Sequence, residues 1–304
     1  LDVNDGTIKL DGNYPVGTGN VALGDAALSS VEAGGNYNVA IGSAAGDAIT
    51  TGDSNIGIGL NALGATTTAS ENIAIGLNAM LANTTGASNV GIGTYALNAN
   101  TTAANNTAVG YQAAQLNTTG TENVAVGRLA LNQATTASYN TAIGTNALQD
   151  NTTGASNTAL GRSALTNNTT ASNNTAVGYQ ALLTNTTGVH NIAVGSTAMQ
   201  NTTTGLNNTA VGGAALISNT TGNTNTALGR QALYLNTTAS SNTAVGYQSL
   251  YDNTTGANNV AVGYSALANN TTANYNAAFG YSALFTNTTG TLNSASGHWA
   301  LYLN

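Results

Sequence analysis

The chain lacks cysteine, and lysine and proline occur once each, at Lys9 and Pro15. Without cysteine there is no disulfide, and the sequence gives no indication of the redox compartment. Charged residues make up 5% of the chain, against about 25% in ordinary soluble proteins. Four Lys and Arg against eleven Asp and Glu argue against nucleic acid as a partner, because such binding needs a basic face. Long apolar runs are also missing, so we expect no membrane-embedded segment.

What the chain has instead is a short repeat. A Gly recurs every 17 residues from Gly42 to Gly297. One further copy, Gly24, lies 18 residues before Gly42. An Asn stands four places before each of these glycines. Self-similarity at a fixed period is the signature of a repeat architecture. We number the repeat from this Asn as positions 1 to 17; Asn174 to His190, NTAVGYQALLTNTTGVH, is one copy.

The repeat divides the chain into two segments. Residues 1–19 lie outside the period and form a lead-in segment, and residues 20–304 form the array of seventeen repeats. The chain starts at Leu1 and stops within a repeat at Asn304, so we expect a processed chain or a fragment whose natural array continues.

The residue types predict an all-β fold. Positions 1 to 5 are rich in β-branched residues and end in Gly, which is typical of a short strand followed by a bend. The Ala-Leu pair at positions 8 and 9 could be a second strand or a helical turn, and we favour two strands per coil. The result is a parallel β-solenoid of seventeen coils, in which each coil is one repeat of positions 1 to 17. Its length would be roughly 80 Å at about 4.8 Å per coil.

The strand pattern also predicts assembly. Position 4 is large and apolar in most repeats, whereas position 3 is Ala or Gly in every repeat, as at Ala176 and Ala193. Side chains at positions 3 and 4 point to opposite faces of a strand, and neither position forms the polar row expected at a solvated surface. Ordering a residue costs about 1–2 kcal/mol, which one buried Val and one buried Leu per coil do not offset. We therefore expect a homotrimer in which the Ala face packs against neighbouring chains.

The repeat resembles known fibrous proteins. NTAVG, NVAVG, NIAIG and NVAIG, each followed by an Ala-Leu-like pair, resemble the head repeats of trimeric autotransporter adhesins. The combination of NTAVGYQAL with NTTG also resembles bacterial and phage tail-fibre-domain proteins. The resemblance covers residues 20–304 and implies a left-handed β-roll of three intertwined chains. It also implies an extracellular place, on a cell surface, in a secreted fibre or on a virion.

The sharpest chemical motif is Asn-Thr-Thr, which has the form of a glycosylation acceptor. It could carry glycans along one edge of the solenoid, or it could be only a turn sequence. A flat Thr surface for ice is disfavoured, because the paired Thr residues would face opposite ways. The acceptor residues are Asn83, Asn100, Asn117, Asn151, Asn168, Asn185, Asn201, Asn219, Asn236, Asn253, Asn270 and Asn287.

Positions 6 and 7 vary most between repeats, which indicates an exposed face. Tyr residues there could bind carbohydrate or another surface, although a solvated rim also explains them. These candidate surface-binding residues are Tyr111, Tyr179, Tyr247, Tyr264 and Tyr281. The Asn at position 1 could stack in a hydrogen-bonded ladder or hold the turn before the strand.

Catalytic chemistry finds no support in the sequence. His190 and His298 are isolated, and a triad or a histidine metal site would need partners that the repeat does not supply. Asp2, Asn4, Asp5 and Asp11 could offer oxygen ligands to calcium, but their spacing favours turns. We therefore expect no enzyme activity, no cofactor and no metal site.

Two functions remain. The first is a structural fibre or adhesin shaft, whose partner is the chain itself and which could be coated with glycans. The alternative is a binding module that recognises carbohydrate or a host surface through its Tyr, Arg and Gln residues. A protein that binds a periodic lattice should carry the same residues at positions 6 and 7 in every repeat. These positions vary, so the shaft is favoured.

Overall fold

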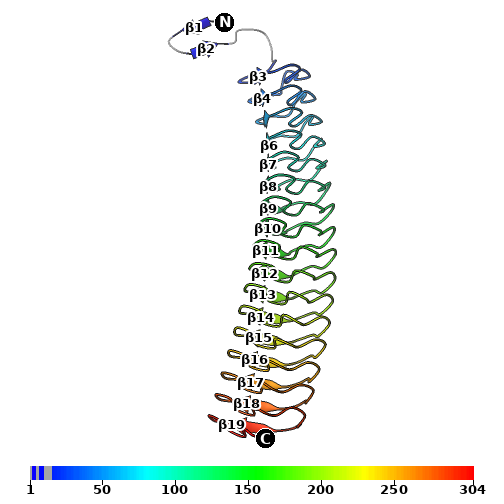
Figure 1. Cartoon of the computed structure of the whole chain (residues 1–304). Helices are drawn as coiled ribbons and strands as arrows, with labels where there is room; N and C mark the ends of the chain where they lie inside the picture. The colour runs from blue at the N-terminus through cyan, green and yellow to red at the C-terminus, as the bar shows by residue number, and fades with distance from the viewer. Residues whose placement is uncertain (1, 5–6, 10–15) are drawn as a thin grey trace. The chain divides into compact units, whose positions relative to one another are not determined.

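The computed structural model describes residues 2–4, 7–9 and 16–304. The chain divides into two compact units, Leu1–Glu122 and Asn123–Asn304, which we call the N-terminal and C-terminal units. In the lead-in segment, β1 (Asp2–Asn4) pairs antiparallel with β2 (Thr7–Lys9). From Val21 onward the chain is built from coils of one kind, each with a single short strand (Figure 1).

Within each unit the strands are parallel and in register, so that each strand residue lies beside its counterpart in the neighbouring repeat of that unit. Thr175, for example, pairs with Ile192, and Ala176 with Ala193. The N-terminal unit contains β3 (Val21–Leu23), β4 (Val39–Ile41), β5 (Ile56–Ile58), β6 (Ile73–Ile75), β7 (Val90–Ile92) and β8 (Thr107–Val109). The C-terminal unit contains β9 (Val124–Val126), β10 (Thr141–Ile143), β11 (Thr158–Leu160), β12 (Thr175–Val177), β13 (Ile192–Val194), β14 (Thr209–Val211), β15 (Thr226–Leu228), β16 (Thr243–Val245), β17 (Val260–Val262), β18 (Ala277–Phe279) and β19 (Ser294–Ser296). The predicted all-β parallel solenoid is confirmed, with no helix in the part of the chain that the structure describes.

The prediction of two strands per coil is wrong, because the Ala-Leu segment is a turn. Positions 7 and 9 both adopt positive φ angles, 53° at Gln180 and 52° at Leu182, which neither a strand nor a right-handed helix allows. The turn is still paired between coils. The Gln180 amide donates to the Arg162 carbonyl at 3.0 Å, and the Leu182 amide to the Ala198 carbonyl at 2.9 Å. Ladder hydrogen bonds therefore continue through the segment without strand geometry.

The Ala at position 3 faces the inside of its own coil, which corrects the expected packing against neighbouring chains. Ala176 has no exposed surface, and neither do Ala181 and Leu182 from the turn of the same coil. Small residues suit this place because the two sides of so short a coil lie close together. The side chains at positions 2 and 4 point outward instead.

The Gly at position 5 marks the closest approach between coils. Gly178 has a φ of 135°, which L side chains rarely adopt. A Cβ there would lie 2.5 Å from the carbonyl oxygen of Gly195 in the next coil. The unbroken glycine spacing therefore follows from both the backbone conformation and the contact.

The Asn at position 1 forms a buried ladder that also closes the coil. The backbone amide of Asn191 donates to Oδ1 of Asn174 at 2.9 Å, one coil away. Nδ2 of Asn191 donates to the carbonyl oxygen of Gly205 at 2.8 Å, across its own coil. The two readings left open by the sequence, a ladder and a turn support, are thus both correct for this residue.

Candidate functional site

The most regular surface of each unit is the outer face of its sheet, formed by positions 2 and 4. In the C-terminal unit, position 2 is Thr, Val or Ile except at Ala277 and Ser294, and position 4 is mainly Val, Ile or Leu. Neither row of the array contains a charged residue. Ile192 is 43% exposed and Val211 40%. The position-4 row is therefore an exposed apolar stripe beside a row in which Thr predominates, and exposed apolar surface of this extent is typical of interaction sites.

The Asn-Thr-Thr motif lies mostly inside the fold. Eleven of the twelve acceptor Asn residues occupy position 12, and none of these is more than 2% exposed. Asn185 is representative of the group. Its Nδ2 donates to Oδ1 of Asn168 at 2.9 Å and to the carbonyl oxygen of Gly188 at 2.9 Å.

These contacts leave no room for a glycan on a position-12 amide. Both hydrogens of the Asn185 Nδ2 group are used in buried hydrogen bonds, and the Gly188 carbonyl also accepts from Nδ2 of Asn174. The structure therefore supports the turn interpretation at these eleven residues. Asn201 is the exception, because it occupies position 11 and is exposed, while Thr202 fills the buried position 12.

The Tyr residues at position 6 form a column where they occur in consecutive repeats. Tyr247, Tyr264 and Tyr281 stack with ring centroids 5.2 and 4.9 Å apart, and His298 continues the stack at 5.1 Å. The guanidinium of Arg230 lies 5.8 Å from the Tyr247 ring centroid.

The other two candidate tyrosines lie outside this column. Tyr179 sits 5.6 Å from the Arg162 guanidinium, elsewhere in the C-terminal unit. Tyr111 is exposed in the N-terminal unit.

A second set of aromatic residues was not singled out by the sequence reasoning. Tyr234 stacks on Tyr251 at 5.0 Å, and Phe285 on Tyr302 at 5.1 Å, all at position 10. The signal was present in the sequence, because the two members of each pair are separated by one full repeat. Ala268 interrupts this position-10 column between Tyr251 and Phe285.

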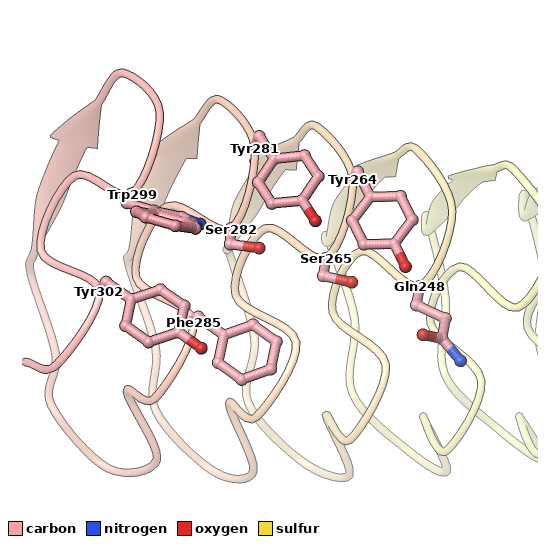
Figure 2. A pocket seen from close by; sticks show the side chains of 8 residues that line it. All are labelled: Gln248, Tyr264, Ser265, Tyr281, Ser282, Phe285, Trp299 and Tyr302. Carbon is pink, nitrogen blue, oxygen red and sulfur yellow. The ribbon is translucent and has the colours of Figure 1, made fainter.

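The two aromatic sets enclose a groove of about 330 Å³ near the C-terminal end of the C-terminal unit. Figure 2 shows Tyr264 and Tyr281 along one side, Phe285 and Tyr302 along the other, and two serines between them. The groove is lined by Gln248, Tyr264, Ser265, Tyr281, Ser282, Phe285, Trp299 and Tyr302, and none of these side chains carries a formal charge at neutral pH.

The remaining candidates form no constellation. His190 is exposed at position 17, and His298 belongs to the Tyr column. Asp2 and Asn4 lie in β1, whereas Asp5 and Asp11 fall outside the described residues. Across residues 2–4, 7–9 and 16–304, no group of three or more His, Cys, Asp or Glu residues could hold a metal ion. The same residues include no helix that could span a membrane.

Burial acts on two carboxyl groups at position 11. It raises the pKa of Asp150 and that of Asp252 above the ordinary value of 3.8. Comparison with known proteins adds no assignment: no protein-family model matches the chain, and no curated protein matches its sequence.

Proposed function

We propose that this protein is a structural fibre element that assembles with copies of itself through the outer sheet face of positions 2 and 4. The observation that carries the proposal is the composition of that face, which has no charged or amide side chain in any repeat. In the C-terminal unit, the ten steps from β9 to β19 extend it over roughly 50 Å at about 4.8 Å per coil. A surface of that length and chemistry is expected to be covered in the working assembly.

A second copy is the occupant that fits this face best. The face repeats with the coil spacing, so a partner with the same period can place its own rows of methyl groups between these rows along the whole length. A globular partner has no such periodicity. The resemblance to trimeric adhesin heads supports three chains, with the three outer faces turned toward a common axis. The same resemblance supports an extracellular fibre or shaft.

The interface differs from the one expected from sequence. Val194 and Val211 lie on it, whereas Ala176 lies inside its own coil. Enlarging Ala176 to Leu should therefore unfold the coil, while introducing a charge at Val194 should separate the chains and leave each coil folded.

Sedimentation of the purified chain tests the proposal. The wild type is expected to sediment as a trimer, and the double variant Val194→Lys with Val211→Lys as a monomer with an unchanged β-type circular dichroism spectrum. The control is Thr187→Lys with Thr204→Lys, two exposed residues at position 14 on another side of the coil. A wild-type monomer at low micromolar concentration would reject self-assembly through this face.

A further inference from the structure

The structure assigns the groove between Tyr264 and Tyr302 as a binding site for an uncharged saccharide. It lies on the side of the coil formed by positions 6, 7 and 10, apart from the strand face proposed for self-assembly. The inference therefore does not depend on that proposal. Three features of the groove carry it: aromatic surface that is not used in stacking, serine hydroxyl groups on its floor, and the absence of charge.

The aromatic surface comes from Phe285 and Trp299. Phe285 stacks one ring face on Tyr302, with an interplanar angle of 5°. The preceding coil has Ala268 at this position, so no ring covers the other face of Phe285. Trp299 is tilted by 38° to His298 and by 55° to Tyr302, and it is 58% exposed. Such faces bind the apolar C–H surface of a sugar ring.

The polar groups lie on the floor. Ser265 and Ser282 are each only 4% exposed. Both serines line the groove, so their hydroxyl groups are open to a ligand there. Figure 2 shows both serines between the two aromatic sides. A ligand hydroxyl can take the place of water at these groups and hydrogen-bond to them.

The groove exists because three side chains are small. Positions 7 and 10 carry larger residues in many other coils, such as Gln180 and Gln231 at position 7. Here Ser265, Ser282 and Ala268 leave the space open. A volume of about 330 Å³ is within the range of small-molecule sites. An apolar surface with a few hydroxyl groups and no formal charge matches a neutral sugar better than an acidic or basic ligand.

The chain contains its own reporter, because Trp299 is its only tryptophan. Maltotriose, cellotriose and triacetylchitotriose should be titrated while Trp299 emission is recorded, with trigalacturonate as the acidic comparison. We expect a saturable change with at least one neutral trisaccharide and none with trigalacturonate. Absence of a change with all three neutral sugars would overturn the inference, as would binding of benzyl alcohol in their place.

Variants at position 7 localise the binding. Ser282→Leu fills the floor, and the fold accepts Leu at this position because Leu129 occupies it elsewhere with a φ of 57°. We expect at least a tenfold weaker affinity for the responding sugar. Ser282→Ala removes only the hydroxyl and should weaken binding about three- to tenfold. The control Ser163→Leu lies at the same position in a coil away from the groove. Equal affinity of Ser282→Leu and Ser163→Leu would overturn the assignment.

Discussion

The buried amide ladder of position 12 has a break whose repair should stabilise the protein. Within the C-terminal unit, Asn168 donates from Nδ2 to Oδ1 of Asn151 at 2.8 Å, and Asn185 donates to Asn168 in the same way. The next coil carries Thr202 at this position. Oδ1 of Asn185 is consequently buried without a hydrogen-bond partner. On the other side of the break, Nδ2 of Asn219 finds no amide oxygen in the preceding coil and donates instead to the Thr202 hydroxyl, at 3.5 Å.

The variant Thr202→Asn restores the missing rung. Its Nδ2 would donate to Oδ1 of Asn185 and to the Gly205 carbonyl, and its Oδ1 would accept from Asn219. Satisfying one buried acceptor is worth about 1–3 kcal/mol, and an ordinary hydrogen bond about 0.5–1.5 kcal/mol net. Allowing for the larger side chain, we expect a gain of about 1–3 kcal/mol. For a unit of this size that corresponds to a rise in melting temperature of several degrees.

Thermal and urea unfolding of unglycosylated protein measure this effect. Asn236→Ala is the matched destabilising variant. It removes the ladder donor to Oδ1 of Asn219 and the ladder acceptor of Nδ2 of Asn253. It should lower stability by about 2–4 kcal/mol. If Thr202→Asn proves neutral or destabilising while its circular dichroism spectrum is unchanged, the orphaned oxygen carries no cost and the ladder argument fails.

Three further predictions concern single coils. Gly178→Ala should lower the free energy of unfolding in urea by at least about 3 kcal/mol, because a Cβ there would meet the Gly195 carbonyl. The control Gly213→Ala, whose Cβ would have nothing within 4 Å, should change it by less than about 0.5 kcal/mol. Equal losses in the two variants would refute the contact. Thr224→Asn should raise the melting temperature, because a β-branched residue there holds a φ of 55° that Asn adopts more easily, as Asn207 and Asn258 do at the same position; a lower melting temperature would contradict this. Burial raises the pKa of Asp252, so its ionisation disfavours folding and stability is lost as pH rises through that raised pKa. Asp252→Asn should therefore be more stable than wild type at neutral pH and equal to it well below 3.8, the ordinary value; a difference that persists in acid would refute the mechanism.

The sequence predicted the coil and its parallel stacking because both depend on spacing. A Gly needed at a close approach and an Asn needed in a ladder recur with the period, so the order of elements could be read directly from Gly42 to Gly297. The number of strands per coil could not be read in this way. Ala181 and Leu182 look compatible with a strand, but the positive φ angles of Gln180 and Leu182, which the sequence does not show, make the segment a turn.

The direction of the side chains was the harder inference. Ala176 and Val177 alternate in a strand, and both faces were expected to be buried, the Ala face against neighbouring chains. In the structure the small Ala176 lies inside its own coil and the larger Val177 lies on the outer face, because the interior is already filled by Leu182 and by the amides of positions 1 and 12. Burial of the Asn-Thr-Thr asparagines escaped prediction for the same reason: a turn is ordinarily exposed, but here the Asn side chain folds into the coil.

The buried amides also explain how the outside can vary while the coil stays constant. In the coil of Asn174, the amides of positions 1 and 12 converge on one carbonyl oxygen, that of Gly188, and close the loop from within. Closure therefore does not depend on the outward residues at positions 6, 7 and 10. Those positions are free to carry Arg162 in one repeat and Tyr264 in another. A binding groove can thus arise by substitution in a few adjacent repeats, and the strand face can remain uniform along its length.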